Sequence, residues 1–190
     1  GTKLEIEGTR FIEIHAYDRG GAIDAAGTYV PLAQPDVAIS SATFIRNRTT
    51  REDVPSTGGG ALCQKTGKLT IVDSDFKANS ASIAKGAAVF LADVVADVHN
   101  SVFAKNEGFF AALHAEYGGP VHIVGSTFAF NDVDCPSTCS VTGDVVVLEN
   151  SLSVGTDKGQ APGFGNGVTV TSSNCDLFTG GGLGATASPF

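Results

Sequence analysis

The apolar and polar positions of this chain follow one short template that recurs along most of its length. The template reads aliphatic, any, aliphatic, two free positions, small polar, any, Phe. Such short alternation is typical of β-strands, and no helical spacing of apolar residues is sustained long enough for a crossover helix. The template therefore predicts an all-β chain. It fits seven segments: 4–11, 37–44, 69–76, 96–103, 121–128, 145–152 and 168–175.

The spacing of these copies predicts the architecture. Their last positions lie 33, 32, 27, 25, 24 and 23 residues apart. A period near 25 residues without helices fits neither leucine-rich repeats nor propeller blades, which need about 40 residues. It fits a parallel β-helix, in which each repeat is one coil and the same strand of successive coils pairs about 4.8 Å apart. We expect one solenoid domain of about seven coils over 1–190, with a lateral loop at 132–144 and a Gly-rich tail at 179–190.

Asparagine follows the template phenylalanine by three residues in four consecutive copies. Asn tolerates a left-handed backbone, and its amide can bond its own turn and the Asn of a neighbouring coil. We therefore expect a structural ladder of inward side chains. Asn47 also begins a glycosylation sequon, Asn47-Arg-Thr49, but an inward side chain is unavailable to a glycan. The ladder comprises Asn47, Asn79, Asn106 and Asn131.

A second unit, Gly-Gly-Ala followed by an aliphatic residue, alternates with the Phe–Asn unit. It occurs at 20–23 and 59–62, with a degenerate copy at 86–89. Glycine suits a bend that needs positive φ or close backbone approach. Over residues 1–131 the alternation resembles the repeat of the polymorphic outer membrane proteins, the autotransported surface adhesins of chlamydiae. That resemblance implies a right-handed parallel β-helix, display at the cell surface, and adhesion or structural assembly, with no catalytic residues.

Composition and charge narrow the classes of partner. The formal net charge is -8, whereas nucleic-acid binding relies on a cationic surface, so no nucleic-acid partner is expected. No apolar run approaches the roughly 20 residues of a membrane-spanning helix. The absence of Met and the glycine-rich tail suggest an excerpt of a longer protein.

The cysteines indicate the compartment. Cys135 and Cys139 lie close together in a loop-like stretch, which predicts a local disulfide and an extracellular or cell-surface, oxidising location. No His lies near them, which disfavours zinc, and no metal or other cofactor is expected. Cys175 occupies a core slot. Cys63 follows an inward Leu and is expected to face outward, which leaves an intermolecular bridge open.

Candidate chemistry lies on the outward positions. Asp73, Asp75 and Lys77 share one side of an extended segment, and Asp97 and His122 occupy the same outward column in adjacent coils. Carboxylates in such places could serve a polysaccharide-acting enzyme. A salt-bridged, solvated face is the simpler interpretation. Motifs of polygalacturonases are absent, and the outward Thr positions form no regular column of the kind that orders ice.

Three aromatic residues, Phe109, Phe110 and Tyr117, fall where the Gly-Gly-Ala unit degenerates. Core filling is the expectation for them, and an exposed carbohydrate or protein contact is the alternative. The sequence therefore predicts a non-enzymatic structural or adhesive surface module. It is expected to bind a protein or glycan partner through the faces and ends of the β-helix, at the cell surface or within a larger assembly. The alternative is a β-helix enzyme acting on polysaccharide as a lyase, hydrolase or epimerase.

Overall fold

A computed structural model describes residues 2–26, 34–50, 58–82, 85–117, 119–133, 139–143, 145–154, 163–164 and 168–170. The expected all-β chain is confirmed: within these residues every regular element is a strand, and every strand pair is parallel. The same residues contain no helix long and apolar enough to cross a membrane.

The largest sheet has 11 strands in two connected parts. The long strands β8 (Leu62–Val72) and β11 (Val89–His99) belong to both parts. Their first residues pair within a row of strands completed by β4 (Ile23–Ala26), β14 (Ala111–Glu116), β18 (Cys139–Thr142) and β21 (Gly163–Phe164). Their last residues pair within a row completed by β1 (Lys3–Glu7), β5 (Asp36–Ser40), β15 (Val121–Val124), β19 (Val146–Glu149) and β22 (Val168–Val170).

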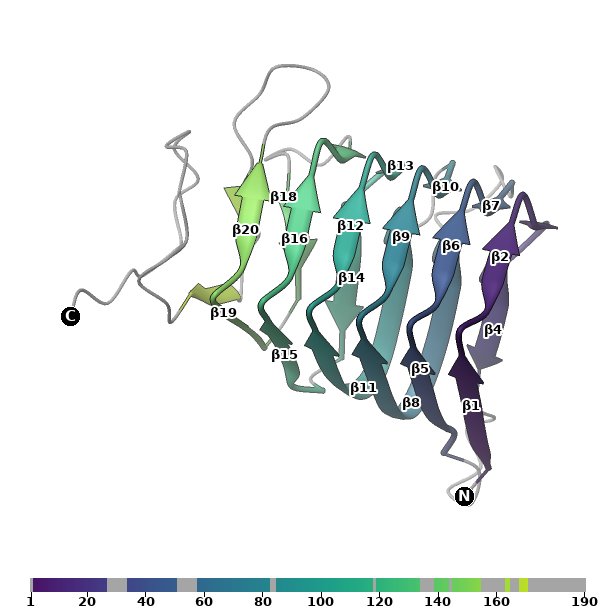
Figure 1. Cartoon of the computed structure of the whole chain (residues 1–190), viewed down its shortest axis with the longest axis horizontal. Coiled ribbons are helices and arrows are strands. Elements are labelled where there is room, and N and C mark those ends of the chain that lie inside the picture. The colour runs from purple at the N-terminus through teal and green to yellow at the C-terminus, as the bar shows by residue number, and fades with distance from the viewer. Residues whose placement is uncertain are drawn as a thin grey trace.

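Two further sheets complete each coil. One contains β2 (Arg10–Ile12), β6 (Thr43–Ile45), β9 (Asp75–Lys77), β12 (Val102–Ala104), β16 (Thr127–Ala129) and β20 (Leu152–Val154). The other contains β3 (His15–Ala16), β7 (Arg48–Thr49), β10 (Ser80–Ala81), β13 (Glu107–Gly108) and β17 (Asp132–Val133). The chain visits the sheets in the same order in each repeat, and equivalent strands stand side by side in Figure 1. This arrangement is consistent with the solenoid-like class.

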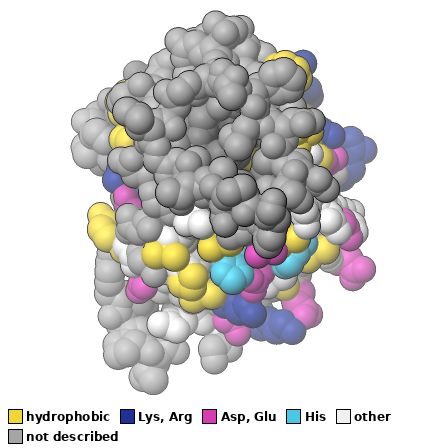
Figure 2. All heavy atoms as spheres, turned by 90° about the vertical axis from the view of Figure 1, so that its left-hand side faces the viewer, with side chains coloured by type: hydrophobic (Ala, Val, Ile, Leu, Met, Phe, Trp, Pro, Cys, Tyr) yellow, Lys and Arg dark blue, Asp and Glu magenta, His cyan; other side chains and the backbone are white. Residues whose placement is uncertain are grey.

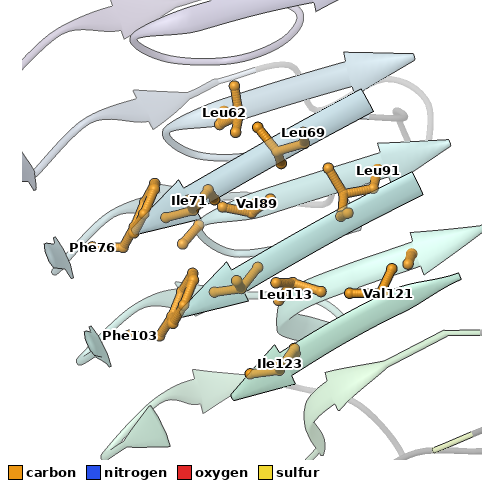
Figure 3. Close-up of a cluster of buried hydrophobic side chains, with 14 of the residues drawn as sticks. Leu62, Leu69, Ile71, Phe76, Val89, Leu91, Phe103, Leu113, Val121 and Ile123 are labelled. Atoms are coloured by element: carbon orange, nitrogen blue, oxygen red, sulfur yellow. The ribbon is translucent and has the colours of Figure 1, made fainter. Parts of the chain in front are cut away.

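The core runs along the axis of the stack because the alternating aliphatic positions and the template Phe all turn inward. Leu69, Ile71 and Phe76 have no exposed surface, and Figure 3 shows them in columns with their equivalents from neighbouring coils. Five phenylalanines form a stack whose successive ring centroids lie 4.8, 4.5, 4.9 and 4.8 Å apart, with interplanar angles of 9° or less. This spacing follows the distance between hydrogen-bonded strands. The stack comprises Phe11, Phe44, Phe76, Phe103 and Phe128.

The predicted register of one template copy, residues 145–152, is wrong by one residue. The structure pairs Val121 with Val146 rather than with Val145, and Ser153 rather than Leu152 lies opposite Phe128. Residues 145–148 are all apolar, so their pattern does not say which ones face inward, and a slip of one residue exchanges the two faces of a strand.

The glycine pairs act as expected. Gly20 has φ +50°, in the left-handed region that favours glycine. A Cβ on Gly60 would overlap the carbonyl oxygen of Ala87 in the next coil, so the backbones can approach only because the side chain is absent. The 179–190 tail, residues 134–138 and 144 of the expected lateral loop, and Cys175 lie outside the described residues.

Candidate functional site

The four predicted asparagines lie in one buried row, at the bend between the second and third sheets, and each is at most 1% exposed. Asn47 Nδ2 donates to Asn79 Oδ1 at 3.0 Å, Asn79 Nδ2 to Asn106 Oδ1 at 3.1 Å, and Asn106 Nδ2 to Asn131 Oδ1 at 3.0 Å. The backbone N–H of each donor residue reaches the same oxygen at 3.0 Å. The row therefore satisfies backbone groups that the bend removes from the sheets.

The left-handed backbone falls on the residue before each asparagine and not on the asparagine itself, which corrects the expected reason for choosing Asn. Arg46, Ala78, Lys105 and Phe130 have φ between 52° and 55°. Asparagine is required at the next position for its amide, which both donates and accepts.

A second buried row consists of serines, and the sequence template did not predict it. Ser74 N–H donates to Ser101 Oγ, Ser101 N–H to Ser126 Oγ, and Ser126 N–H to Ser151 Oγ, each at 3.2 Å. These side chains are 1–2% exposed. The small polar slot of the template was the available signal, because a recurring buried hydroxyl needs a recurring partner.

The predicted polar face separates into two parts on the surface. Asp75 and Lys77 project from β9 and form an ion pair at 2.9 Å, with side chains 37% and 45% exposed. Asp73 lies instead in the exposed bend before β9, with φ +50°. An exposed ion pair of this kind contributes only about 0–1 kcal/mol.

Asp97 and His122 do occupy opposite positions of neighbouring strands. Asp97 lies 3.7 Å from Lys68 Nζ, in an ion pair whose side chains are 35% and 57% exposed. Figure 2 shows histidine, acidic and basic side chains interspersed on part of the face turned toward the C-terminal coils. No group of three or more His, Cys, Asp or Glu side chains able to hold a metal ion occurs in the part of the chain that the structure describes.

The cysteines are described only in part. Cys135 lies outside the described residues, and of Cys139 only the backbone, in β18, is described. Cys63 has no exposed surface and belongs to a small cluster with Phe90 and Ala92, separate from the main core. Burial is the main cause that raises the pKa of its thiol to about 12. The expected accessible Cys63, and the intermolecular bridge built on it, do not fit this position.

The most concentrated polar chemistry is a cluster that the sequence patterns did not single out. We call Lys85, His114, Glu116 and Thr142 the tetrad. His114 and Glu116 project from β14, Thr142 belongs to β18, and Lys85 precedes β11. Glu116 Oε2 lies 2.6 Å from Lys85 Nζ and 3.4 Å from His114 Nε2, and His114 Nδ1 lies 2.5 Å from Thr142 Oγ1.

The tetrad is largely shielded from water. The side chains of His114 and Glu116 are 12% and 11% exposed, and that of Lys85 is 27% exposed. Glu116 Oε1 is buried and has no hydrogen-bond partner among the residues that the structure describes. The cluster is therefore a nearly buried ion pair in which one carboxylate oxygen has no hydrogen-bond donor. Buried polar atoms without a partner are rare in native proteins, so this one calls for an explanation.

Aromatic rings border the tetrad. Phe90 stacks on His114 at 5.9 Å between centroids, and Phe110 tilts against the same ring at 5.4 Å. Phe109 meets Phe110 edge-on at 5.0 Å and is 43% exposed. Tyr117 is 69% exposed. Core filling is therefore wrong for Phe109 and Tyr117, and the alternative of an exposed contact fits them.

Comparison with known proteins adds no relative. No protein-family model, curated protein or solved structure matches this chain.

Proposed function

We propose that this chain is a right-handed parallel β-helix that serves as a non-enzymatic structural or adhesive module at the cell surface. In this proposal it binds a protein or glycan partner through its lateral faces. The observation that carries the proposal is the continuity of the interior: rows of Phe, Asn and Ser run through successive coils. Such rows make a stiff scaffold and leave the outer positions for binding.

The chirality of parallel connections supports the right-handed form. A strand, a crossover and a second parallel strand in the same sheet follow a right-handed path in about 98% of cases. Here the connection from β1 to β5 and that from β5 to β8 are of this kind.

The pairing of outward charges favours binding over catalysis. A glycosidase needs two carboxyl groups about 5–10 Å apart with their oxygens open to substrate. Four of the outward acids, Glu5, Glu13, Asp75 and Asp97, each lie within ion-pair distance of a Lys or Arg. The tetrad contains a single carboxylate, Glu116.

Surface display is supported by the resemblance of residues 1–131 to the repeat of the polymorphic outer membrane proteins. The expected disulfide between Cys135 and Cys139 would suit an oxidising, extracellular location.

Adhesion under flow tests the proposal. Beads coated with the folded chain pass over surfaces bearing immobilised neutral glycans, mucin-type glycoprotein or extracellular-matrix protein. We expect retention above that of albumin-coated beads on at least one surface. Retention on none of them would contradict the proposal. Release of oligosaccharides from a panel of polysaccharides incubated with the chain would also contradict it and would favour the enzymatic alternative.

A further inference from the structure

The tetrad carries unused hydrogen-bonding capacity at a place with no net charge. Lys85 and Glu116 compensate each other at 2.6 Å. Within the described part of the chain Glu116 Oε1 accepts no hydrogen bond, although a buried carboxylate oxygen normally has a donor. Lys85 has three N–H donors and remains 27% exposed, so it can serve a second partner at its open side. A molecule with hydroxyl groups would supply an acceptor to Lys85 on that side, while the shielded carboxylate of Glu116 holds Lys85 in place.

An aromatic surface adjoins these polar groups. Lys85 Nζ lies 5.9 Å from the centroid of Phe110, and Phe110 is in edge contact with the half-exposed ring of Phe109. An exposed ring held in place by a second ring loses little conformational freedom when a ligand covers it. Apolar surface beside a few placed polar groups is the usual composition of a small-molecule site.

We propose that Phe109, Phe110, Lys85 and Glu116 form a binding site for a neutral carbohydrate. The C–H face of a sugar ring lies on Phe109, and its hydroxyl groups reach Lys85, which Glu116 holds in place. This site deepens the proposed function by naming a glycan as the partner, and it rests on that function.

Charge selects the neutral class of sugar. The site itself has a balanced ion pair, while the whole chain has a formal net charge of -8. A uronate or sulfated sugar would therefore approach a surface of its own sign, which lowers its rate of encounter and its affinity.

The tetrad argues against cleavage of that sugar, because glycosidases use two carboxyl groups and the tetrad contains one, Glu116. His114 and Thr142 resemble two members of a hydroxyl–imidazole–carboxylate relay. However, Glu116 Oε2 is already held by Lys85 at 2.6 Å and lies 3.4 Å from His114 Nε2, a weak contact for an orienting group. His114 is hydrogen-bonded to Thr142 and lies beside Glu116, and the tetrad is therefore assigned to binding.

Ligand-detected NMR and calorimetry on the full chain test the site. The probes are cellotetraose, maltotetraose, chitotetraose and mannotetraose, with trigalacturonate as the anionic comparison. We expect saturable binding of at least one neutral probe, and at least tenfold weaker binding after Phe109→Ala or Glu116→Gln. Phe130→Ala is a matched control because Phe130 is also 43% exposed. Asp75→Asn, which breaks the exposed ion pair with Lys77, is the second control.

Thermal unfolding of each variant establishes that it is folded before binding is compared. Three results would overturn the site: saturable binding of no neutral probe, tighter binding of trigalacturonate than of every neutral probe, or an equal loss in the control variants. Beads that still adhere to a protein-coated surface while no neutral probe binds would remove the glycan site alone. Failure of both experiments would remove the proposed function as well.

Discussion

Replacing Asn79 with Ala removes the centre of the asparagine row. The side chain donates to the carbonyl oxygen of Phe44 at 3.0 Å and to Asn106 Oδ1 at 3.1 Å. Its own oxygen accepts the backbone N–H and the Nδ2 of Asn47, both at 3.0 Å. The substitution therefore leaves two main-chain groups, the Phe44 carbonyl and the Asn47 N–H, without the hydrogen-bond partner that Asn79 supplied. Asn79 itself has no exposed surface, so water does not replace it.

The loss follows from the cost of a buried polar group without a partner, about 1–3 kcal/mol for each group. Two such groups predict a decrease of about 2–6 kcal/mol in the free energy of unfolding for Asn79→Ala. Urea unfolding, followed by circular dichroism, measures it as a lower midpoint with an unchanged slope. Asn100→Gly is the control, because Asn100 is exposed and has φ +48°, a conformation that Gly adopts easily. A loss for Asn79→Ala no larger than that of the control would refute the structural role of the row.

Three further predictions concern the interior. Phe103→Ala empties the centre of the ring stack and should lower the free energy of unfolding by about 3–5 kcal/mol in the same urea assay; a loss below that of the Asn100→Gly control would contradict this. Ser101→Ala leaves the N–H of Ser74 without its acceptor, so we expect a loss of about 1–3 kcal/mol, and an unchanged urea midpoint would contradict it. Burial raises the pKa of the Cys63 thiol from 9.0 to about 12, so the thiol ionises at lower pH in the unfolded chain than in the folded one. The free energy of unfolding should therefore fall as pH rises from 9 toward 12, and it should fall less in Cys63→Ala. Equal pH profiles of the two proteins would show the burial to be wrong.

The repeat made the fold predictable because the same residue types recur where each coil has the same physical need. Phe fills the core at the second sheet, Asn satisfies the backbone at the bend between the second and third sheets, and Ser does so at the bend before the second sheet. The positions of Asn47 and Asn79 could thus be assigned to the interior from spacing alone. The Ser row was readable in the same way, since Ser74 and Ser101 occupy equivalent template slots, but a small residue also suits a bend for steric reasons alone.

The rest depended on information that no local pattern contains. The register of 145–152 was ambiguous because an apolar run has no alternation. In the structure the hydrogen bond from Ser126 N–H to Ser151 Oγ identifies the register, but this contact joins two repeats and no local pattern shows it. The tetrad joins residues 28 and 31 positions apart, in a coil where the glycine unit is degenerate. His114 and Glu116 are two residues apart and so lie on one side of β14, but nothing in the sequence showed that Lys85 and Thr142 lie beside them.

A distance between two outward positions of one column tests the stacked-coil account most directly. Arg10 and Thr127 are 117 residues apart in sequence, but the register places them four strand steps apart in the second sheet. Four steps correspond to about 19 Å between their backbones. Genetically encoded spin labels at the two positions, measured by pulsed dipolar spectroscopy, should give a narrow distribution centred near that distance after allowance for the label arms. A broad distribution, or one centred at more than twice that distance, would contradict the stacked coils and the binding faces that depend on them.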